Sequence, residues 1–438
     1  MGTTIKPDGS SRKQILLAAC IFMGLAHIMY LKQYLKGAVL TAVEVIFILA
    51  SPSIYTNIRK MLALQGNLNN PSSFRLIDGL FYLILAIMFI IVYVITIKNA
   101  MTSYEDFCLD GRMKSQKESV AGMAGKSFPI FAMAPAFLLI LFFVVVPLLF
   151  SMLAAFTSYS DSGEIKGGAN SFGWVGFENF STMFSGTSGW SGSFASVAVW
   201  TVVWGFLATI TCYLGGMIMA VILYEAKLKV TPVFRAILIL PYAVPSLLTI
   251  SVWNNLLDGK KFGIINATLI QFGIIDEKSP IQFLSSSSGS ARMWCILINM
   301  WCGIPYFMLL VTGQMTAISA DVYEAAAIDG ANEFQVFTNI TLPLVVYQTA
   351  PLIIMSFTHN INNFGAVYYL TGGGPNTDQT TITKAGGTDI FISWIYKIST
   401  DSKQYNMGAV LAIFVFAVLA PFAIFNFINT KSFKEGEL

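Results

Sequence analysis

The chain has 438 residues, of which 55% are hydrophobic and only 11% are charged, and its formal net charge is +3. An average soluble domain is about 25% charged, because charged side chains are needed to cover a water-exposed surface. The composition therefore excludes an ordinary soluble protein and predicts an integral membrane protein. The small net charge gives no reason to expect nucleic acid as a partner.

Eight apolar segments are long enough to cross a bilayer, which takes about 20 helical residues. They lie at 37–57, 78–98, 130–156, 196–224, 233–257, 291–316, 347–370 and 407–429. A ninth apolar stretch within 14–35 is shorter, and we expect it to form an interfacial or re-entrant helix. The pattern predicts an all-α fold with about eight transmembrane helices and both chain ends in the cytoplasm. Lys and Arg residues are only slightly more frequent on the predicted inner side, so charge supports this orientation weakly.

The inner loop 99–129 contains AGMAGKS at 121–127, which imitates a phosphate-binding loop. The full pattern needs a glycine where the chain has Val120, and it needs a helix after the loop, where Phe128 and Pro129 open a membrane span. We therefore predict no ATPase site in this chain. Two histidines and five scattered cysteines give no basis for a metal site or a cofactor, and no catalytic constellation is visible.

Three aromatic residues beside prolines in the fifth and sixth spans are candidates for stacking on sugar rings. They are Tyr242, Trp301 and Tyr306. Prolines interrupt both spans, and broken helices often line a substrate path. Aromatic residues are also common in membrane cores, so packing is the alternative.

The loop 319–344 is acidic and rich in alanine, and no Lys or Arg occurs between Gln314 and Gln379. We expect Asp321 to cap a short helix, and Gly330 to end it with a left-handed backbone conformation. A second short helix is expected at 332–339, before Pro343 opens the seventh span. The loop is therefore predicted to be a helix–turn–helix at the membrane surface; the alternative is an ordinary solvated loop.

One face of the seventh span carries polar side chains. At 100° per residue, an arc of about 100° contains Ser356, His359, Asn360 and Asn363. A hydroxyl, two amides and an imidazole offer both the donors and the acceptors that a sugar requires. Asn and Ser also hold membrane helices together, so structural packing remains the alternative. A proton-sensing role for His359 is a further, weaker hypothesis.

The loop fits the pattern EAA-x3-G-x9-I-x-LP at every fixed position. These positions are Glu324, Ala325, Ala326, Gly330, Ile340, Leu342 and Pro343. With average residue usage, such a match has a probability of about one in 10⁵. The pattern resembles the coupling loop of ABC importer permeases, which inserts into a cleft on a cytoplasmic ATPase subunit. The resemblance implies that Glu324, Ala325, Ala326 and Gly330 are contact and hinge positions.

The resemblance extends over about residues 130–430. It includes WVGFENF at 174–180, LPYAVPSLLTISVWNNLL at 240–257, NMWCGIPYFMLLVTGQ at 299–314 and NNFGAVYYLTGGGP at 362–375. These stretches are similar to the carbohydrate group of such permeases, in particular MalF-type subunits of maltose/maltodextrin importers. The resemblance implies a type I ABC importer permease fold. Together with the apolar segments, it leads us to expect four regions: an N-terminal segment at 1–36, a transmembrane hairpin at 37–98, a cytoplasmic loop at 99–129, and a permease core at 130–438 with its coupling loop at 319–344.

The same resemblance implies a set of partners in a bacterial cell membrane. They are a second, homologous permease subunit (MalG-type), two ATPase subunits and an extracellular sugar-binding protein, which would contact 158–195 and 371–404. It also implies that the oligosaccharide contacts Trp301 and Tyr306 together with Ser356, Asn360 and Asn363 of the seventh span. His359 departs from the aromatic residue expected there. The MYLKQYLKGA stretch at 29–38 resembles Gram-positive relatives.

Two other classes of membrane protein would need charged residues that the sequence lacks. An ion-coupled secondary sugar transporter needs intramembrane charged residues, and the spans hold almost none apart from Glu44. A membrane enzyme such as a glycosyltransferase needs acidic residues at metal-ligand spacing in a loop, and the chain offers none. The sequence therefore favours a transport subunit without enzymatic activity of its own.

Overall fold

A computed structural model of the chain describes residues 9–64, 66, 70–110, 128–160, 171–186, 189–225 and 230–428. The regular elements of these residues are helices, joined by turns and loops in which two isolated β-bridges occur, Thr157 with Trp174 and Asn376 with Gly386. Seven of their helices are long and apolar enough to cross a membrane, and a sharply bent pair raises the number to as many as eight. The predicted all-α membrane fold is thus confirmed. The phosphate-loop imitation at 121–127 lies outside the described residues.

The chain divides into two compact units, which are described separately. The first comprises residues 1–159 and 163–175, and the second comprises 160–162 and 176–438. The four regions expected from the sequence, including a core that begins at residue 130, remain a prediction.

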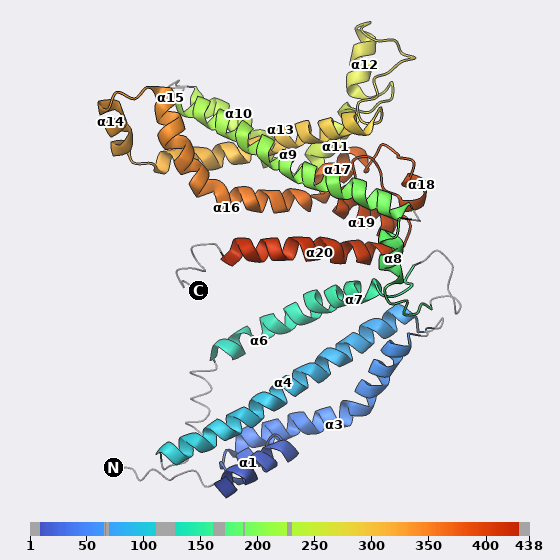
Figure 1. Cartoon of the computed structure of the whole chain (residues 1–438), viewed down its shortest axis with the longest axis vertical. Coiled ribbons are helices and arrows are strands. Elements are labelled where there is room, and N and C mark those ends of the chain that lie inside the picture. Colours follow the sequence, from blue (N-terminus) through green and yellow to red (C-terminus); the bar gives the residue numbers. More distant parts are fainter. Residues whose placement is uncertain are drawn as a thin grey trace. The chain divides into compact units, whose positions relative to one another are not determined.

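The first unit is built on a long antiparallel hairpin of two apolar helices (Figure 1). Its elements are α1 (Gly9–Ile21), α2 (Leu25–Met29), α3 (Tyr34–Ala63), α4 (Ser72–Asp110), α6 (Phe128–Ile140), η1 (Leu141–Val145) and α7 (Val146–Ala154). The last three form one candidate span. Neither α1 nor α2 is a candidate span. The interfacial or re-entrant element expected at 14–35 remains a prediction.

The turn between α1 and α2 packs closely on α3. A Cβ atom on Gly24 would lie only 2.0 Å from the carbonyl oxygen of Gly37, so a larger residue at this position would push the elements apart. Glu44 of α3 is buried, and its carboxylate accepts a hydrogen bond from the backbone N–H of Met23 at 2.6 Å. Glu44 therefore has a structural role, because its carboxylate satisfies a backbone N–H just before α2 that has no partner within the helix.

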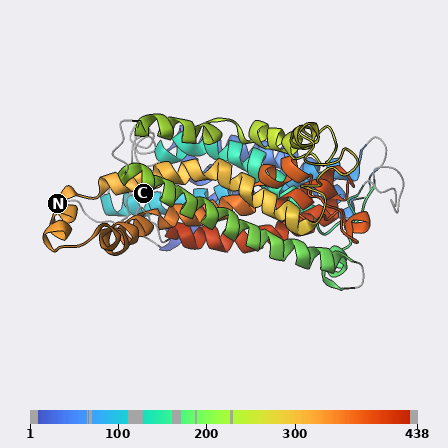
Figure 2. The same ribbon diagram turned by 90° about the horizontal axis from the view of Figure 1, so that it is seen from above.

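The second unit contains the helices that carry the candidate sites. Its elements are α8 (Glu178–Phe184), α9 (Trp190–Glu225), α10 (Thr231–Ala243), α11 (Ser246–Leu256), α12 (Ile264–Gln271), α13 (Ser288–Ala317), α14 (Ala320–Ile328), α15 (Glu333–Val336), η2 (Phe337–Thr341), α16 (Leu342–Ile361), α17 (Phe364–Thr371), α18 (Thr380–Thr383), α19 (Phe391–Thr400) and α20 (Tyr405–Ile428). Figures 1 and 2 show α9, α13, α16 and α20 running alongside one another, with α14 at one end and α18 and α19 at the other.

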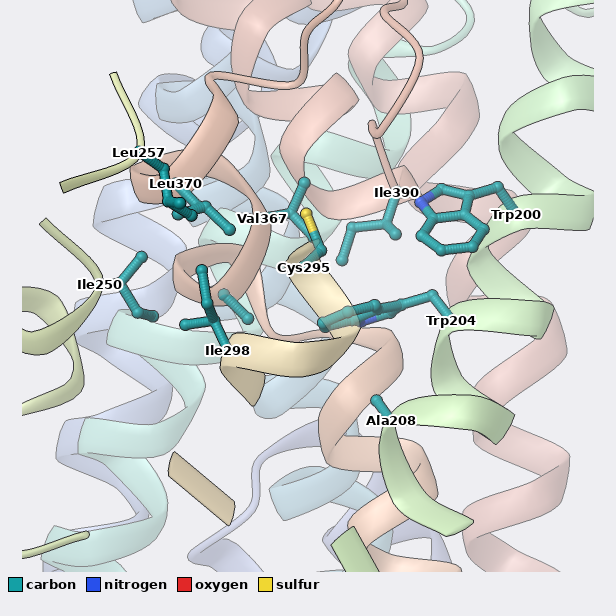
Figure 3. Packing of buried hydrophobic residues seen from close by; sticks show 11 residues of the cluster. Trp200, Trp204, Ala208, Ile250, Leu257, Cys295, Ile298, Val367, Leu370 and Ile390 are labelled. Carbon is teal, nitrogen blue, oxygen red and sulfur yellow. The ribbon is translucent and has the colours of Figure 1, made fainter. Parts of the chain in front are cut away.

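An apolar cluster joins α9, α11, α13 and α17 near the α18 end of this unit (Figure 3). Trp204 is fully buried and Trp200 nearly so, and both lie with Cys295 and Ile298 of α13. The indole of each tryptophan also donates a hydrogen bond from Nε1. Trp200 donates to the Thr388 carbonyl and Trp204 to the Asn360 carbonyl, each at 3.0 Å. A buried indole needs such a partner, so these bonds tie α9 to both segments.

Two of the predicted spans are broken. In the fifth, α10 and α11 meet at an angle of 89°. Val244 is extended there because Pro245 follows it, and the residue before a proline avoids the helical conformation. In the seventh, α16 ends at Ile361 and α17 begins at Phe364. The expectation of one continuous helix over 347–370 is therefore wrong at Asn362 and Asn363.

Candidate functional site

The loop 319–344 forms two helical arms joined by a tight turn. The first arm is α14, and its N-cap is Ser319, whose Oγ accepts from the N–H of Asp321 at 3.4 Å. Asp321 was expected to be the cap. It lies instead within the first turn of α14, where a carboxylate interacts favourably with the positive end of the helix dipole.

The turn and the second arm follow from local residue chemistry. Gly330 adopts φ +76°, which confirms the predicted left-handed residue after α14. Asn332 caps α15 through a reciprocal pair of bonds with Gln335, both at 2.9 Å. The prediction that the second arm ends before Pro343 is wrong, because α15, η2 and α16 form one continuous helical segment over Glu333–Ile361.

The two arms present an unusual surface. Ile328 is 86% exposed and Phe334 is 75% exposed, while Glu324 and Ala325 are also exposed. A hollow of about 720 Å³ lies between the arms. Its lining residues are Asp321, Val322, Ala325, Ala326, Asp329, Gly330, Ala331, Gln335, Asn339 and Ile340. Large uncovered apolar side chains beside carboxylates indicate a protein-binding surface.

The four positions implied by the coupling-loop resemblance have different environments. Glu324, Ala325 and Gly330 lie at the surface of the loop, whereas Ala326 is only 7% exposed. Ala326 is thus buried, although it also belongs to the lining of the hollow between the arms. The contact roles of all four remain predictions.

The candidate aromatic residues gather beside the break between α10 and α11. The rings of Tyr242 and Tyr306 have centroids 5.8 Å apart. Trp301 packs edge-on against Trp253 at 5.5 Å. Tyr242 and Trp301 are about half exposed, so their faces are accessible.

A cavity of about 480 Å³ lies next to these rings, between α10, α11 and α13. Trp301 and Thr249 lie in a lining that is otherwise formed by aliphatic, proline and methionine side chains. Such a wall suits the apolar face of a sugar better than its hydroxyl groups. Hydrogen-bonding groups would have to come from another element.

The polar residues of the seventh span do not form one free face. Asn360 is 5% exposed, and its Nδ2 donates to Thr209 Oγ1 of α9 at 2.9 Å. Asn363 caps α17, because its Oδ1 accepts from the N–H of Ala366 at 3.2 Å. Both amides therefore have structural partners. Because α16 ends at Ile361, Asn363 is not part of the predicted polar face of that helix.

Other polar side chains at this break are exposed or partly exposed, although Asn362 Nδ2 also donates to the Thr358 carbonyl at 3.5 Å. His359 and Asn362 are exposed, and Ser356 is partly exposed. Asn362 was expected to point away from the polar face, and the end of α16 at Ile361 leaves it outside that helix. Asn254 of α11 donates to the carbonyl of Leu370 at 2.5 Å, so the sharply bent fifth span is tied to α17. No signal in the sequence indicated this contact.

The segment between α17 and α19 is organised around a buried carboxylate. Asp389 is 1% exposed and accepts from Lys397 Nζ at 2.7 Å, Ser393 Oγ at 2.8 Å and the N–H of Gly386 at 2.7 Å. Burial raises the pKa of Asp389, while the Lys397 ammonium opposes that rise. A Cβ on Gly373 would lie 2.1 Å from Asp389 Oδ1, which explains one glycine of TGGGP.

A family model described as "Binding-protein-dependent transport system inner membrane component" matches residues 212–433, just over half of the chain. The chain belongs to this family. It is a multi-pass membrane permease of an ABC sugar importer, and its MalF-type resemblance is confirmed.

Two relatives match the permease over nearly its whole length. The galactooligosaccharides transport system permease protein GanP of Bacillus subtilis is 34% identical over 430 residues, covering 97% of this chain and 99% of GanP. The maltodextrin transport system permease protein MalC of Streptococcus pneumoniae is 31% identical over 434 residues, covering 95% and 96%.

A solved structure supports the type I importer fold of the permease. It is a chain of a bacterial ABC transporter involved in the import of the acidic polysaccharide alginate. The TM-score is 0.55 at 20% sequence identity, and the match covers 70% of this chain and 97% of that one.

Proposed function

We propose that this permease carries oligosaccharides of the maltodextrin class into the cytoplasm, and that two separate ATPase subunits hydrolyse the ATP. The observation that carries the proposal is the arm–turn–arm geometry of the 319–344 loop. It displays Ile328 and Phe334 uncovered beside the exposed Glu324. Closure of an ATPase dimer against this surface would push on α14, and the continuous segment Glu333–Ile361 would transmit the push into the membrane.

The charged side chains of the spans favour ATP hydrolysis by a partner over ion coupling as the source of energy for transport. Among the described side chains of the candidate spans, the one buried carboxylate is Glu44, and it is bonded to the backbone of Met23. An ion-coupled transporter needs a titratable or cation-binding group that can change its state inside the membrane. The alternative of a secondary sugar transporter is therefore not favoured.

The remaining partners follow from the same proposal. A homologous MalG-type subunit completes the membrane pathway, and an extracellular sugar-binding protein delivers the sugar at the end of the second unit opposite α14. The loops expected to receive that protein are 158–195 and 371–404. Both termini would be cytoplasmic, and the full-length match to two proteins of Gram-positive organisms supports a Gram-positive source.

The sugar path would pass the breaks in the fifth and seventh spans. Tyr242, Trp301 and Tyr306 supply ring faces there, and Ser356, His359 and Asn362 supply exposed or partly exposed polar groups. Asn360 and Asn363 would reach a sugar only if their bonds to Thr209 and Ala366 open during transport. The binding roles of all these residues are part of the proposal.

Galactooligosaccharides are a second candidate class of substrate. GanP, whose name specifies them, matches the permease at 34% identity over nearly the full length of both chains. The imidazole of His359, in place of an expected aromatic ring, changes the hydrogen-bonding capacity at the break. Both observations make the choice of sugar an experimental question.

The test is purification of the tagged chain from its host in mild detergent, followed by ATPase assays. We expect a second permease and an ATPase to co-purify, with hydrolysis raised by a binding protein loaded with maltodextrin. Greater stimulation by galactooligosaccharide would assign that sugar class as the substrate, and the proposed ABC importer function would still hold. Sugar uptake by the isolated chain without ATP would contradict the proposal.

A further inference from the structure

The loop at residues 258–281, between α11 and α13, is held together by one buried side chain. Asn266 of α12 is fully buried. Its Nδ2 lies 3.1 Å from the Asp258 carbonyl, 3.4 Å from that of Lys260 and 3.0 Å from that of Ile281. Its Oδ1 accepts from the N–H of Ile281 at 3.0 Å. One amide thus closes both ends of the loop, which gives it a defined shape.

This well-held loop leaves large apolar side chains in the open. The exposed fractions are 81% for Phe262, 74% for Phe272, 66% for Ile274 and 54% for Ile264. Single exposed apolar residues are ordinary, but these four lie within thirteen residues of a loop outside the candidate spans, and together they favour burial against another surface. The preceding helix α11 also leaves Leu248 and Val252 exposed.

The orientation of the loop narrows the choice of partner. Figure 1 shows α12 standing off the end of α13, across the direction in which α9, α13 and α16 run. These long helices run along the membrane normal if they span it, so the loop extends sideways and does not continue outward along that normal. A lateral projection reaches either lipid or a neighbouring membrane protein.

The charge of the loop favours a protein over lipid headgroups. Lys260, Lys261 and Lys278 are balanced by Asp258, Asp276 and Glu277. Lys261 and Glu277 also form an ion pair at 2.9 Å. Attachment to anionic lipid needs an excess of basic residues, which this loop lacks. A neutral apolar patch matches the surfaces of permanent protein partners, whose interfaces are the more hydrophobic ones.

We infer that the 258–281 loop is a lateral contact that packs on an apolar outer surface of the second permease subunit. The inference rests on the proposed function, which supplies that subunit. Phe262 and Phe272 are the anchoring side chains, and Asn266 positions them. The loop holds the two permeases together at the end opposite their ATPase-binding arms, so the contact does not depend on the sugar-binding protein.

The test is photo-crosslinking in the membrane-embedded complex. The photoreactive amino acid p-benzoylphenylalanine replaces Phe262 or Phe272, and in a parallel chain Ile328, before irradiation and identification of adducts by mass spectrometry. We expect positions 262 and 272 to give adducts with the homologous permease, in equal yield with and without the sugar-binding protein. Position 328 should give an adduct with the ATPase.

Each other result is also decisive. Adducts at 262 and 272 that contain only the sugar-binding protein, or no protein at all, would overturn the inference. An ATPase adduct at 328 would leave the proposed function standing in that case. Failure at 328, with no second permease in the purified complex, would instead count against the proposed function.

A second measurement does not depend on crosslinking. The double variant Phe262→Ser and Phe272→Ser should lose the second permease on purification in detergent. The matched variant Ile382→Ser alters an apolar residue of α18 that is 60% exposed at the same end of the unit. It should retain the second permease. Equal retention by both variants would contradict the lateral contact.

Discussion

At the scale of single residues, Asn360 shows how a polar side chain in a membrane helix can have two explanations. Its residue type and position favour sugar binding, whereas in the structure its side-chain amide donates to Thr209 Oγ1 and its backbone carbonyl accepts from the Trp204 indole. The structural bond joins α16 to α9, and such bonds contribute about 0.6 kcal/mol on average between membrane helices. The two roles are separable by mutation.

We expect Asn360→Ala to lower sugar uptake. Thr209→Val removes the other half of the same hydrogen bond and is the matched control. If Asn360 only holds the helices, both variants should lose thermal stability to a similar extent and keep the wild-type sugar concentration at half-maximal uptake. A rise in that concentration confined to Asn360→Ala would assign it a role in binding sugar.

The ion pair of Asp389 and Lys397 is a second case at this scale. Lys397→Met leaves a buried carboxylate without its counter-charge, and such a change costs about 3–5 kcal/mol. We expect a marked fall in the thermal denaturation temperature of the purified protein. Combining it with Asp389→Asn should recover most of the loss. A single Lys397→Met variant of wild-type stability would show that the pair is not important for stability.

At the scale of elements, the α14 turn depends on one backbone conformation. Gly330 has φ +76°, and there is open space around it. A larger side chain would therefore meet no neighbouring atoms, but its backbone would be strained. A non-glycine residue in this conformation costs about 1–2 kcal/mol, and Asn tolerates it better than most.

We expect Gly330→Asp to abolish transport while the chain remains in the membrane, because strain and added charge would alter the arm that meets the ATPase. Gly330→Asn should retain more uptake than Gly330→Val, which has the least tolerance for positive φ. Uptake assays with membrane fractionation would check this. Equal uptake by all three variants would argue against a coupling role.

The α1–α2 element provides a dependence on pH. His27 is fully buried and its Nδ1 lies 3.0 Å from Gln33 Oε1. Burial, followed by the nearby Lys36 ammonium, lowers the pKa of His27 from 6.5 to about 4. The folded state therefore disfavours the protonated form, so stability is full above pH 6.5 and falls as pH drops from 6.5 to 4.

At pH 5 the predicted loss is about 2 kcal/mol, from 1.36 kcal/mol per pH unit. Limited proteolysis of the α1–α2 region between pH 7.5 and 5 would measure it. His27→Gln keeps a polar side chain that does not titrate here, so its proteolysis should change less with pH. Identical profiles for both proteins would exclude His27 as the cause.

At the scale of the whole molecule, function depends on surfaces that one chain leaves uncovered. The 319–344 arms display Ile328 and Phe334, and covering an apolar side chain contributes about 1.5–3 kcal/mol. We expect Ile328→Ser with Phe334→Ser to weaken ATPase binding by at least about tenfold, since 1.4 kcal/mol is a factor of ten. Co-purification of the ATPase measures this, with Ile382→Ser as the control. Undiminished recovery would contradict the docking role.

Some properties of this protein follow from local sequence. Membrane location, the approximate number of spans and the left-handed turn at Gly330 depend on hydrophobicity and backbone preference, which act over a few neighbouring residues. The family could likewise be inferred from the spacing of Glu324, Gly330 and Pro343. Ser319 was missed as the cap of α14 because Asp321, two residues later, is also of a type that caps helices.

Other properties depend on packing between distant segments and were decided only by the tertiary structure. The pairing of Asn360 with Thr209 joins residues 151 positions apart, and the bond from Asn254 to Leu370 spans 116. The periodicity of hydrophobic residues in the sequence does not predict such partners, because a hydrogen bond between helices depends on where the two helices meet. For the same reason, only the folded chain reveals that Phe262 and Phe272 stay uncovered.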